Sequence, residues 1–189
     1  MTEIAAWRKA ERQRLLEARS AIPFEERHAY TERIAAGLDR AVGEISGRTV
    51  SAYSPIRSEP DLRPWLARIF ARGGVCALPV VVEPRRPLIF RAWQPGARME
   101  RGFWNIPVPA DGKEVVPDIV IAPVVGFDRN NYRLGYGGGF FDRTLAAMTP
   151  KPRIIGVGYA QAEIPTIHPQ PHDIALDIIV TERGVIGEL

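Results

Sequence analysis

Four glycines lie between two arginines in the stretch RLGYGGGFFDR, residues 133–143. Consecutive glycines let backbone N–H groups converge on an anion, and a helix that starts directly afterwards adds the positive end of its dipole. Arg133 and Arg143 supply fixed positive charge suited to phosphate oxygens. Asp142 repels phosphate by itself, but it is suited to bind a phosphate-bound Mg²⁺. The stretch therefore contains the residue types that MgATP binding requires.

The same glycines also fit a tight turn, which needs positive φ angles and no ligand. The stretch is not a Walker A loop, because no Gly-Lys-Ser/Thr closes it. It is not a dinucleotide fingerprint either, since the spacing is G-x-G-G-G rather than G-x-G-x-x-G. Taken alone, the glycines leave both a turn and an anion-binding loop open.

A second group of basic residues lies near the amino end of the chain. Arg8, Arg12 and Arg19 are spaced by four and seven residues, which places them within roughly 40° of one another around an α-helix. A solvated basic face is the commoner explanation for such a pattern, and a second phosphate-binding surface is the alternative.

The hydrophobic pattern predicts the elements that would position these residues. It predicts helices over 3–19, 23–42, 61–72 and 139–148, the third with Asp61 as its N-cap, and strands over 48–55, 73–82, 87–93, 118–127, 153–160 and 175–182. Residues 94–117 are rich in Pro and Gly and are interpreted as a long surface segment. The strands lack polar alternation, which is typical of a sheet covered on both faces. We expect one three-layer α/β domain over residues 1–189, with a central, mostly parallel sheet flanked by helices.

Composition narrows the class of protein. Apolar residues make up 46% of the 189 residues and charged residues 25%, which is typical of a globular chain. The net charge of +3 is modest and the basic residues are spread along the chain, so we expect no nucleic-acid partner. No apolar run approaches the ~20 residues that span a bilayer, and the single cysteine, Cys76, excludes an internal disulfide. We therefore expect a cytoplasmic monomer without a membrane partner.

The glycine stretch belongs to a longer similarity. The segment GFDRNNYRLGYGGGFFDRTL (126–145) resembles the signature of the 5-formyltetrahydrofolate cyclo-ligase family, whose members are also called methenyltetrahydrofolate synthetases. Four other segments resemble this family in the same order along the chain: WRKAERQRLLEARSAIPFEER, SEPDL, FWNIPVP and PHDIALDIIVTE. Ordered matches over nearly the whole chain are specific, whereas any single one would be weak.

The resemblance implies a three-layer α/β fold and a ring closure that depends on ATP and Mg²⁺. In that reaction 5-formyltetrahydrofolate becomes 5,10-methenyltetrahydrofolate, and ADP and phosphate are released. The formyl oxygen attacks the γ-phosphate, N10 attacks the activated carbon, and phosphate then leaves. Such chemistry asks a protein mainly for positioning and charge stabilisation, which agrees with the lack of a convincing Ser/His/Asp or Cys/His set.

The resemblance also implies roles for individual residues. It assigns ATP contacts to Arg8, Lys9, Arg12, Arg133, Leu134, Gly135, Tyr136, Gly137, Gly138, Gly139, Phe140 and Phe141. It assigns Mg²⁺ to Asp142 and Asp177, with Arg133 and Asp142 as the catalytic residues, and folate to Ser54, Glu59, Trp104, Phe140 and Phe141. Glu59 would recognise the pterin, because a carboxylate can pair with a ring N–H and an exocyclic amino group. Asp173 lies close to Asp177 and is either a supporting acid or a turn residue.

Two departures from the family pattern leave alternatives open. Arg8 stands where the family usually has lysine, and Phe140 and Phe141 stand where two tyrosines are common. The missing hydroxyls favour a non-catalytic family member that binds folate or nucleotide. A nucleic-acid-binding domain that uses the arginine-rich helix is a further alternative. The acids at 59, 142 and 177 favour the enzyme.

Overall fold

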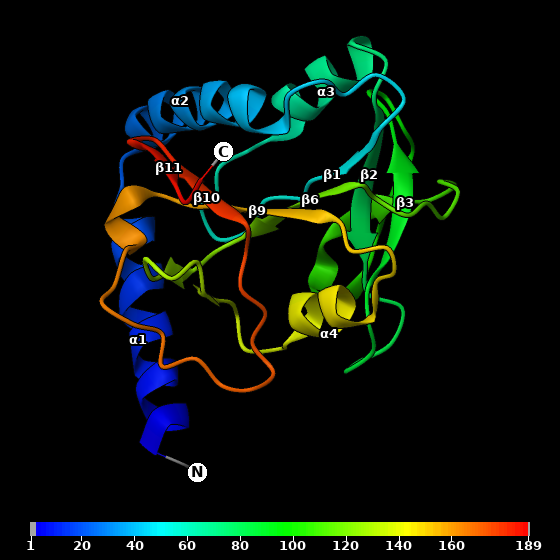
Figure 1. Ribbon diagram of the computed structural model, residues 1–189. Helices are drawn as coiled ribbons and strands as arrows, with labels where there is room; N and C mark the ends of the chain where they lie inside the picture. The colour runs from blue at the N-terminus through cyan, green and yellow to red at the C-terminus, as the bar shows by residue number, and fades with distance from the viewer. Residues whose placement is uncertain (1–2, 189) are drawn as a thin grey trace.

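Seven strands form one sheet at the centre of the computed structural model, which describes residues 3–188 (Figure 1). Their order across the sheet is β11 (Gly184–Ile186), β10 (Ile178–Thr181), β9 (Arg153–Val157), β6 (Ile119–Pro123), β1 (Thr49–Ser51), β2 (Val75–Val80) and β3 (Ile89–Trp93). Neighbouring strands from β10 to β2 are parallel, and the two edge strands are antiparallel to their neighbours. The expected mostly parallel sheet is confirmed.

Helices cover both faces of this sheet. Helices α2 (Phe24–Val42) and α3 (Arg63–Ala71) lie along one face, and α1 (Glu3–Ser20) and α4 (Phe140–Ala147) lie on the other (Figure 1). Each pair packs on its own cluster of buried apolar side chains, one containing Leu38 of α2 and the other containing Leu145 of α4. The expected three-layer α/β architecture is therefore confirmed.

The central strand β6 shows why the strands are apolar without alternation. Ile119 and Ile121 point into the cluster under α2 and α3, whereas Val120 points into the cluster under α1 and α4. Both faces of the strand are fully buried, so every position is best filled by an apolar, β-branched side chain.

Several boundaries differ from the expectation. The segment 94–117 is not a structureless surface loop: it contains the antiparallel pair β4 (Met99–Arg101) and β5 (Pro107–Pro109), joined through the short helix η1 (Phe103–Asn105). Helix α3 is capped by Leu62 rather than by Asp61, although the Asp61 carboxylate still accepts the Arg63 N–H at 3.1 Å. The expected strand over 118–127 is divided, because the chain leaves the sheet at Pro123 and forms a separate pair, β7 (Gly126–Phe127) with β8 (Arg133–Leu134).

The β7–β8 pair places the glycine stretch at the edge of the sheet where the parallel strands end. Strand β8 runs directly into the glycines, and α4 begins immediately after Gly139. This loop lies beyond the carboxyl ends of β1, β2 and β6, the edge at which open α/β sheets bind ligands.

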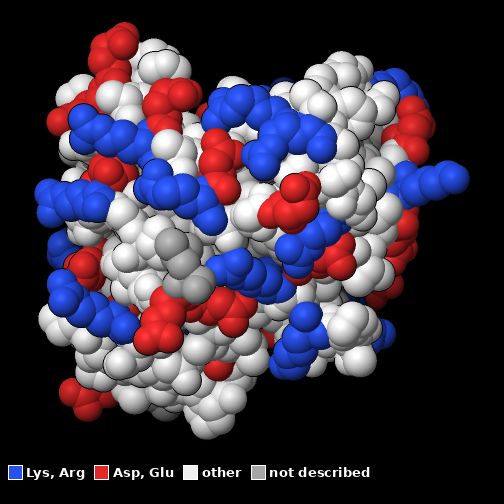
Figure 2. Space-filling model, turned by 45° about the horizontal axis from the view of Figure 1, so that its top comes forward, with Lys and Arg blue, Asp and Glu red and all other residues white. Residues whose placement is uncertain are grey.

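The surface shows mixed charge on the face that carries the top layer of helices. Basic and acidic side chains lie beside one another across this face (Figure 2). Exposed ion pairs such as Arg63–Asp61 and Arg98–Asp111 join opposite charges at the surface. No helix among the described residues is long and apolar enough to span a membrane.

Candidate active site

A single pocket collects residues that lie far apart in the sequence. It opens at the carboxyl ends of β1, β2 and β6, where Ser54, Pro79 and Pro123 line its wall. The other lining residues include nearly all the predicted ligand contacts: Arg8, Arg12, Glu59, Trp104 and every residue from Arg133 to Asp142. The structure thus brings the amino-terminal helix, the SEPDL segment, the tryptophan block and the glycine loop to one place.

The glycine loop is both a tight turn and a wall of the pocket. Gly137 and Gly139 have φ values of +96° and +63°, a region that favours glycine. A Cβ on Gly137 would lie 3.5 Å from the guanidinium carbon of Arg12, and Arg12 Nε donates a hydrogen bond to the Gly135 carbonyl at 2.7 Å. A tight turn and an anion-binding loop are therefore compatible here, because the positive φ angles let the loop approach a basic side chain closely.

Arg133 and Asp142 form a buried ion pair at the floor of the glycine loop. The Arg133 Nη2 atom lies 3.0 Å from Asp142 Oδ2, and both side chains are at least 85% buried. Asp142 Oδ1 also accepts the Ile174 N–H at 3.2 Å. Arg133 Nε has no hydrogen-bond partner among the described residues, and burial lowers the pKa of this guanidinium while Asp142 opposes the shift. The pair therefore holds a buried cation with unused donor capacity inside the pocket.

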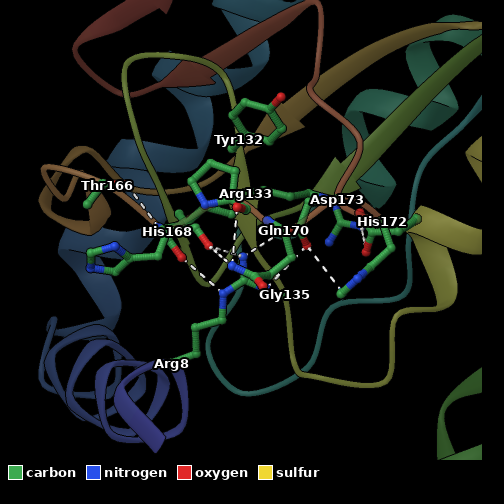
Figure 3. Close-up of polar contacts among 12 residues, drawn as sticks. Arg8, Tyr132, Arg133, Gly135, Thr166, His168, Gln170, His172 and Asp173 are labelled. Carbon is green, nitrogen blue, oxygen red and sulfur yellow. Dashed lines mark hydrogen bonds and ion pairs between the residues drawn. The ribbon is translucent and has the colours of Figure 1, made fainter. Parts of the chain in front are cut away.

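A second ion pair joins α1 to the carboxyl-terminal part of the chain. Arg8 pairs with Asp173 and donates to the carbonyls of Ile167 and His168, each at 3.0 Å (Figure 3). Burial alone would raise the pKa of Asp173, but hydrogen bonds from Arg8 and from the Gln170 N–H outweigh burial and hold the pKa below its ordinary value. Arg8 is thus not part of a solvated basic face, because only 8% of its surface is exposed.

Lys9 and Asp177 lie outside this pocket. Lys9 is exposed and lines a neighbouring open hollow along α1, which Arg12 and Tyr136 also line. Asp177 precedes β10 at the amino ends of the strands, where its Oδ2 accepts the Ile154 N–H at 2.6 Å. The pocket is at the opposite edge of the sheet, so the structure does not bring Asp177 together with Asp142, the other residue to which the resemblance assigns Mg²⁺.

Asp173, four residues before Asp177, is the acid that the structure places in the pocket beside Asp142. It lines the pocket with Asp142, and the amide of the next residue, Ile174, binds Asp142 directly. No group of three or more His, Cys, Asp or Glu side chains suited to a metal occurs among the described residues. Mg²⁺ nevertheless fits this site, because it is commonly held by one or two carboxylates together with waters and substrate phosphates.

Glu59 lies at the other end of the pocket, where two uncharged groups donate hydrogen bonds to its carboxylate. Its Oε2 accepts the Ile56 N–H at 2.8 Å, and its Oε1 accepts the Tyr136 hydroxyl at 2.6 Å. Burial raises the pKa of Glu59, and these hydrogen bonds together with the charges of Arg19 and Arg57 only partly offset that rise. Each carboxylate oxygen keeps one free lone pair, so Glu59 can still accept two hydrogen bonds from a ligand.

Aromatic side chains form the wall beside Glu59. Trp104 is 59% exposed, and its ring meets Phe140 edge to face at 6.1 Å between centroids. Ser54 at the end of β1 donates to the Pro107 carbonyl at 2.7 Å and so ties the tryptophan block to the sheet. Phe141 lies on the other side of the loop, 5.3 Å from the Arg133 guanidinium carbon. An exposed flat surface of this kind suits a planar heterocycle.

A family model described as the 5-formyltetrahydrofolate cyclo-ligase family matches residues 4–182 of this chain. The chain belongs to this family. It is 32% identical over 182 residues to the 5-formyltetrahydrofolate cyclo-ligase of Mycolicibacterium smegmatis, covering 92% of this chain and 93% of that protein. It is 28% identical over 148 residues to the Escherichia coli K12 enzyme of the same name, covering 75% and 81% of the two chains.

Solved structures agree with this family. The NMR structure of Aquifex aeolicus 5,10-methenyltetrahydrofolate synthetase matches with a TM-score of 0.78 and 27% identity, covering 94% of this chain and 91% of that one. The structure of the Mycoplasma pneumoniae 5,10-methenyltetrahydrofolate synthetase matches with a TM-score of 0.76 at 23% identity, covering 93% and 98%, and supports the fold alone.

The sequence alone does not assign His172 and Asp173 to the pocket of this cyclo-ligase family member, although both line it. His172 lines the pocket next to Asp173, and its Nε2 lies 3.9 Å from the Asp173 carboxylate. The sequence allows Asp173 to be either a supporting acid or a turn residue. The signal that favours Asp173 is the buried arginine stripe of α1, because a buried Arg8 requires an acid near the pocket and only the fold shows which acid it meets.

Proposed function

We propose that this chain closes the ring of 5-formyltetrahydrofolate with MgATP, and that the pocket described above holds both substrates. The observation that carries the proposal is the convergence of two different chemical environments in one pocket. One end has arginines and ion-paired acids beside a glycine loop, and the other has a buried glutamate beside aromatic rings. All of these residues come from one chain, so the proposed pocket needs no residue from a second copy.

The triphosphate of ATP binds at the end formed by α1 and the glycine loop. Arg12 and Arg133 supply positive charge there, and the start of α4 adds the N-terminal end of its dipole. Lys9 lies in the adjoining hollow, which shares Arg12 and Tyr136 with the pocket, so we assign it to the outer part of the nucleotide. Nucleic acid is not required to explain this basic surface.

Asp142 and Asp173 are the residues that would hold Mg²⁺. When bound, the ion neutralises charge on the phosphates during phosphoryl transfer. Arg133 and Arg8 pair with the two carboxylates and fix their orientation before any ligand enters. Asp177 is not part of this proposal, since its carboxylate is bound at the other edge of the sheet.

The folate binds at the end formed by Glu59 and the aromatic wall. The free lone pairs of Glu59 accept a ring N–H and the exocyclic amino group of the pterin. Phe140 and Trp104 provide flat apolar contact. With the pterin fixed in this way, the formyl oxygen faces the glycine loop and the γ-phosphate. It attacks the γ-phosphorus and ADP leaves; N10 then attacks the activated carbon, loses its proton, and inorganic phosphate departs.

The test is a direct assay of the purified protein with 5-formyltetrahydrofolate and MgATP. We expect the absorbance of the conjugated methenyl product to appear, with one ADP formed for each product. Omission of Mg²⁺ should stop the reaction. Tight binding of both substrates without any methenyl product would refute the proposal and would favour the non-catalytic binder.

A further inference from the structure

Arg19, at the end of α1, is a buried cation that forms no ion pair among the described residues. Its residue is 5% exposed, and no acidic side chain lies within ion-pair distance of its guanidinium. It donates instead to three neutral oxygens: the Arg57 carbonyl at 2.9 Å, the Val124 carbonyl at 3.4 Å and the hydroxyl of Tyr136. A buried charge without a direct counter-ion is costly, so its retention here calls for a reason.

The three oxygens belong to three different parts of the pocket. Arg57 lies in the turn that carries Glu59, a turn in which Arg57 and Ser58 both have positive φ values. Val124 follows the end of β6, and Tyr136 belongs to the glycine loop. Arg19 therefore connects the turn before Glu59, the sheet and the loop through one planar group.

Arg19 fixes the direction of the two hydrogen bonds that join it to Tyr136 and Tyr136 to Glu59. A guanidinium can only donate, so the Tyr136 hydroxyl must accept from Arg19. The single proton of that hydroxyl then remains for Glu59, whose Oε1 lies 2.6 Å away. The chain of hydrogen bonds runs from Arg19 through Tyr136 to Glu59, and each bond strengthens the next.

The charged and titratable groups around Glu59 come from four segments. Tyr136 comes from the glycine loop, Arg19 from α1, Arg57 from the adjoining turn and Tyr53 from the end of β1. Arg19 and Arg57 favour the ionised carboxylate, whereas burial opposes it. Arg57 is exposed and its charge is screened by water, so the buried Arg19 is the better placed of the two cations.

We propose that Arg19 is a positioning residue for folate recognition: through Tyr136 and the 56–59 turn it fixes the orientation of Glu59 and favours its ionised form. This proposal rests on the assignment of Glu59 to the pterin. Arg19 itself lines neither of the two hollows next to Tyr136, so it acts without touching either substrate. The nucleotide end of the pocket has its own arginines and does not depend on it.

The experiment compares Arg19→Met and Arg19→Lys with the wild type, and uses Arg14→Met as a matched control. Arg14 is on the same helix, but its side chain is 60% exposed and pairs only with Glu11. Arg19→Met should raise the KM for the folate by about tenfold or more, the effect of losing one charge-assisted hydrogen bond, and should change the KM for ATP less than about twofold. Arg14→Met should change neither.

The pH profile gives a second readout that a merely structural role would not move. Loss of the Arg19 charge raises the pKa of Glu59 further, so the acid limb of kcat/KM for the folate should move to higher pH in Arg19→Met. Arg19→Lys keeps the charge but loses the planar guanidinium that donates to three oxygens. Its acid limb should therefore stay near that of the wild type, while its KM for the folate should lie between those of the wild type and Arg19→Met. A lower melting temperature with an unchanged KM ratio and an unchanged acid limb would overturn the proposal.

Two further measurements keep the outcome interpretable. If Arg19→Met does not fold, Tyr136→Phe removes only the hydroxyl that joins Arg19 to Glu59 and should raise the folate KM. An unchanged folate KM would overturn the proposal. Folate affinity is also measured by calorimetry without ATP. A wild type that binds folate but forms no methenyl product refutes the proposed function, whereas equal folate affinity of the wild type and Arg19→Met refutes the role of Arg19.

Discussion

The two ends of the pocket combine arginines and acids in different ways. At the nucleotide end the partners touch directly, as in Arg133 with Asp142 and Arg8 with Asp173. At the folate end a tyrosine hydroxyl separates Arg19 from Glu59. The pKa of Asp173 is held below its ordinary value, whereas that of Glu59 is raised. The same residue types thus give an acid with a lowered pKa at one end, Asp173, and an acid with a raised pKa at the other, Glu59.

This difference matches what each end has to bind. Phosphates and Mg²⁺ are charged, so Arg133 and Arg8 could bind phosphate oxygens while Asp142 and Asp173 would hold the metal, and no charge would be left unpaired. The edge of a pterin that carries a ring N–H and the exocyclic amino group offers two donors to a carboxylate. An acid held by a tyrosine and a backbone N–H keeps acceptor capacity for such donors, which an acid in a bidentate arginine pair has already used.

The largest expected effect comes from breaking the direct pair at the nucleotide end. Asp142→Ala should lower kcat by about two orders of magnitude or more, because charge stabilisation of a transferring phosphoryl group is worth several kcal/mol. Steady-state methenyl formation measures the loss. Asp177→Asn is the control, as its carboxylate only accepts the Ile154 N–H at the far edge of the sheet. A similar loss in both variants would contradict the placement of the metal site.

Glu59→Gln should raise the KM for the folate by about ten- to a hundredfold, since a ligand donor then meets an amide N–H₂ in place of an acceptor. The KM for ATP should change less than about twofold. Equal changes for both substrates would show that the two ends are not separate sites.

The raised pKa of Glu59 also predicts a pH-dependent difference in stability. A buried acid whose folded pKa is raised contributes stability below its ordinary value of 4.5 and loses it as pH rises through the raised value. Glutamine does not titrate. The melting temperature of Glu59→Gln should therefore gain on that of the wild type as the pH increases from about 4 to 8, and calorimetry at several pH values checks the trend. A difference that is independent of pH would show that the carboxylate titrates normally.

Arg12→Ala should weaken ATP binding by about tenfold, the cost of removing one cation that reaches the phosphates. Because Arg12 is only partly buried, the melting temperature should change little. Equilibrium titration with ATP measures the affinity, and Arg14→Ala serves as the control on the solvent side of the same helix. Unaltered affinity in Arg12→Ala would separate α1 from the nucleotide site.

Phe140→Tyr and Phe141→Tyr should have the smallest effects. No proton transfer in the ring closure demands a phenol, and the contacts of Phe140 with Trp104 and of Phe141 with Arg133 depend on the ring alone. We expect each variant to keep kcat within about twofold of the wild type, since one solvent-side hydroxyl adds little net energy. A clear acceleration in either variant would show that the missing hydroxyls limit this enzyme.

The layers of the fold could be predicted because buried strands and amphipathic helices leave strong local patterns. The arginine spacing on α1 was also informative, although sequence alone could not decide between a solvated face and a buried one. That choice depends on what α1 packs against, which is a segment more than 150 residues away. The short strands β7 and β8 were missed because two residues are too few to show a period.

The sequence alone cannot decide which of the two acids, Asp173 or Asp177, lies in the pocket. The two acids are four residues apart in one segment, and both are followed by apolar residues. Only the start of β10 at Ile178 and its parallel pairing with β9 decide the outcome, because they place Asp177 at the amino end of the strands. Strand pairing is a long-range property, so the composition of PHDIALDIIVTE could not reveal it.

The contacts of Arg8 also set an order of events during synthesis. Helix α1 emerges from the ribosome early, whereas its carbonyl partners at residues 167 and 168 and its acid partner at 173 are among the last parts to appear. Loop closure over such a distance comes late in folding. The proposed nucleotide site is therefore completed only after nearly the whole chain has left the ribosome, and a nascent chain truncated before Asp173 carries the glycine loop without the acid that pairs with Arg8.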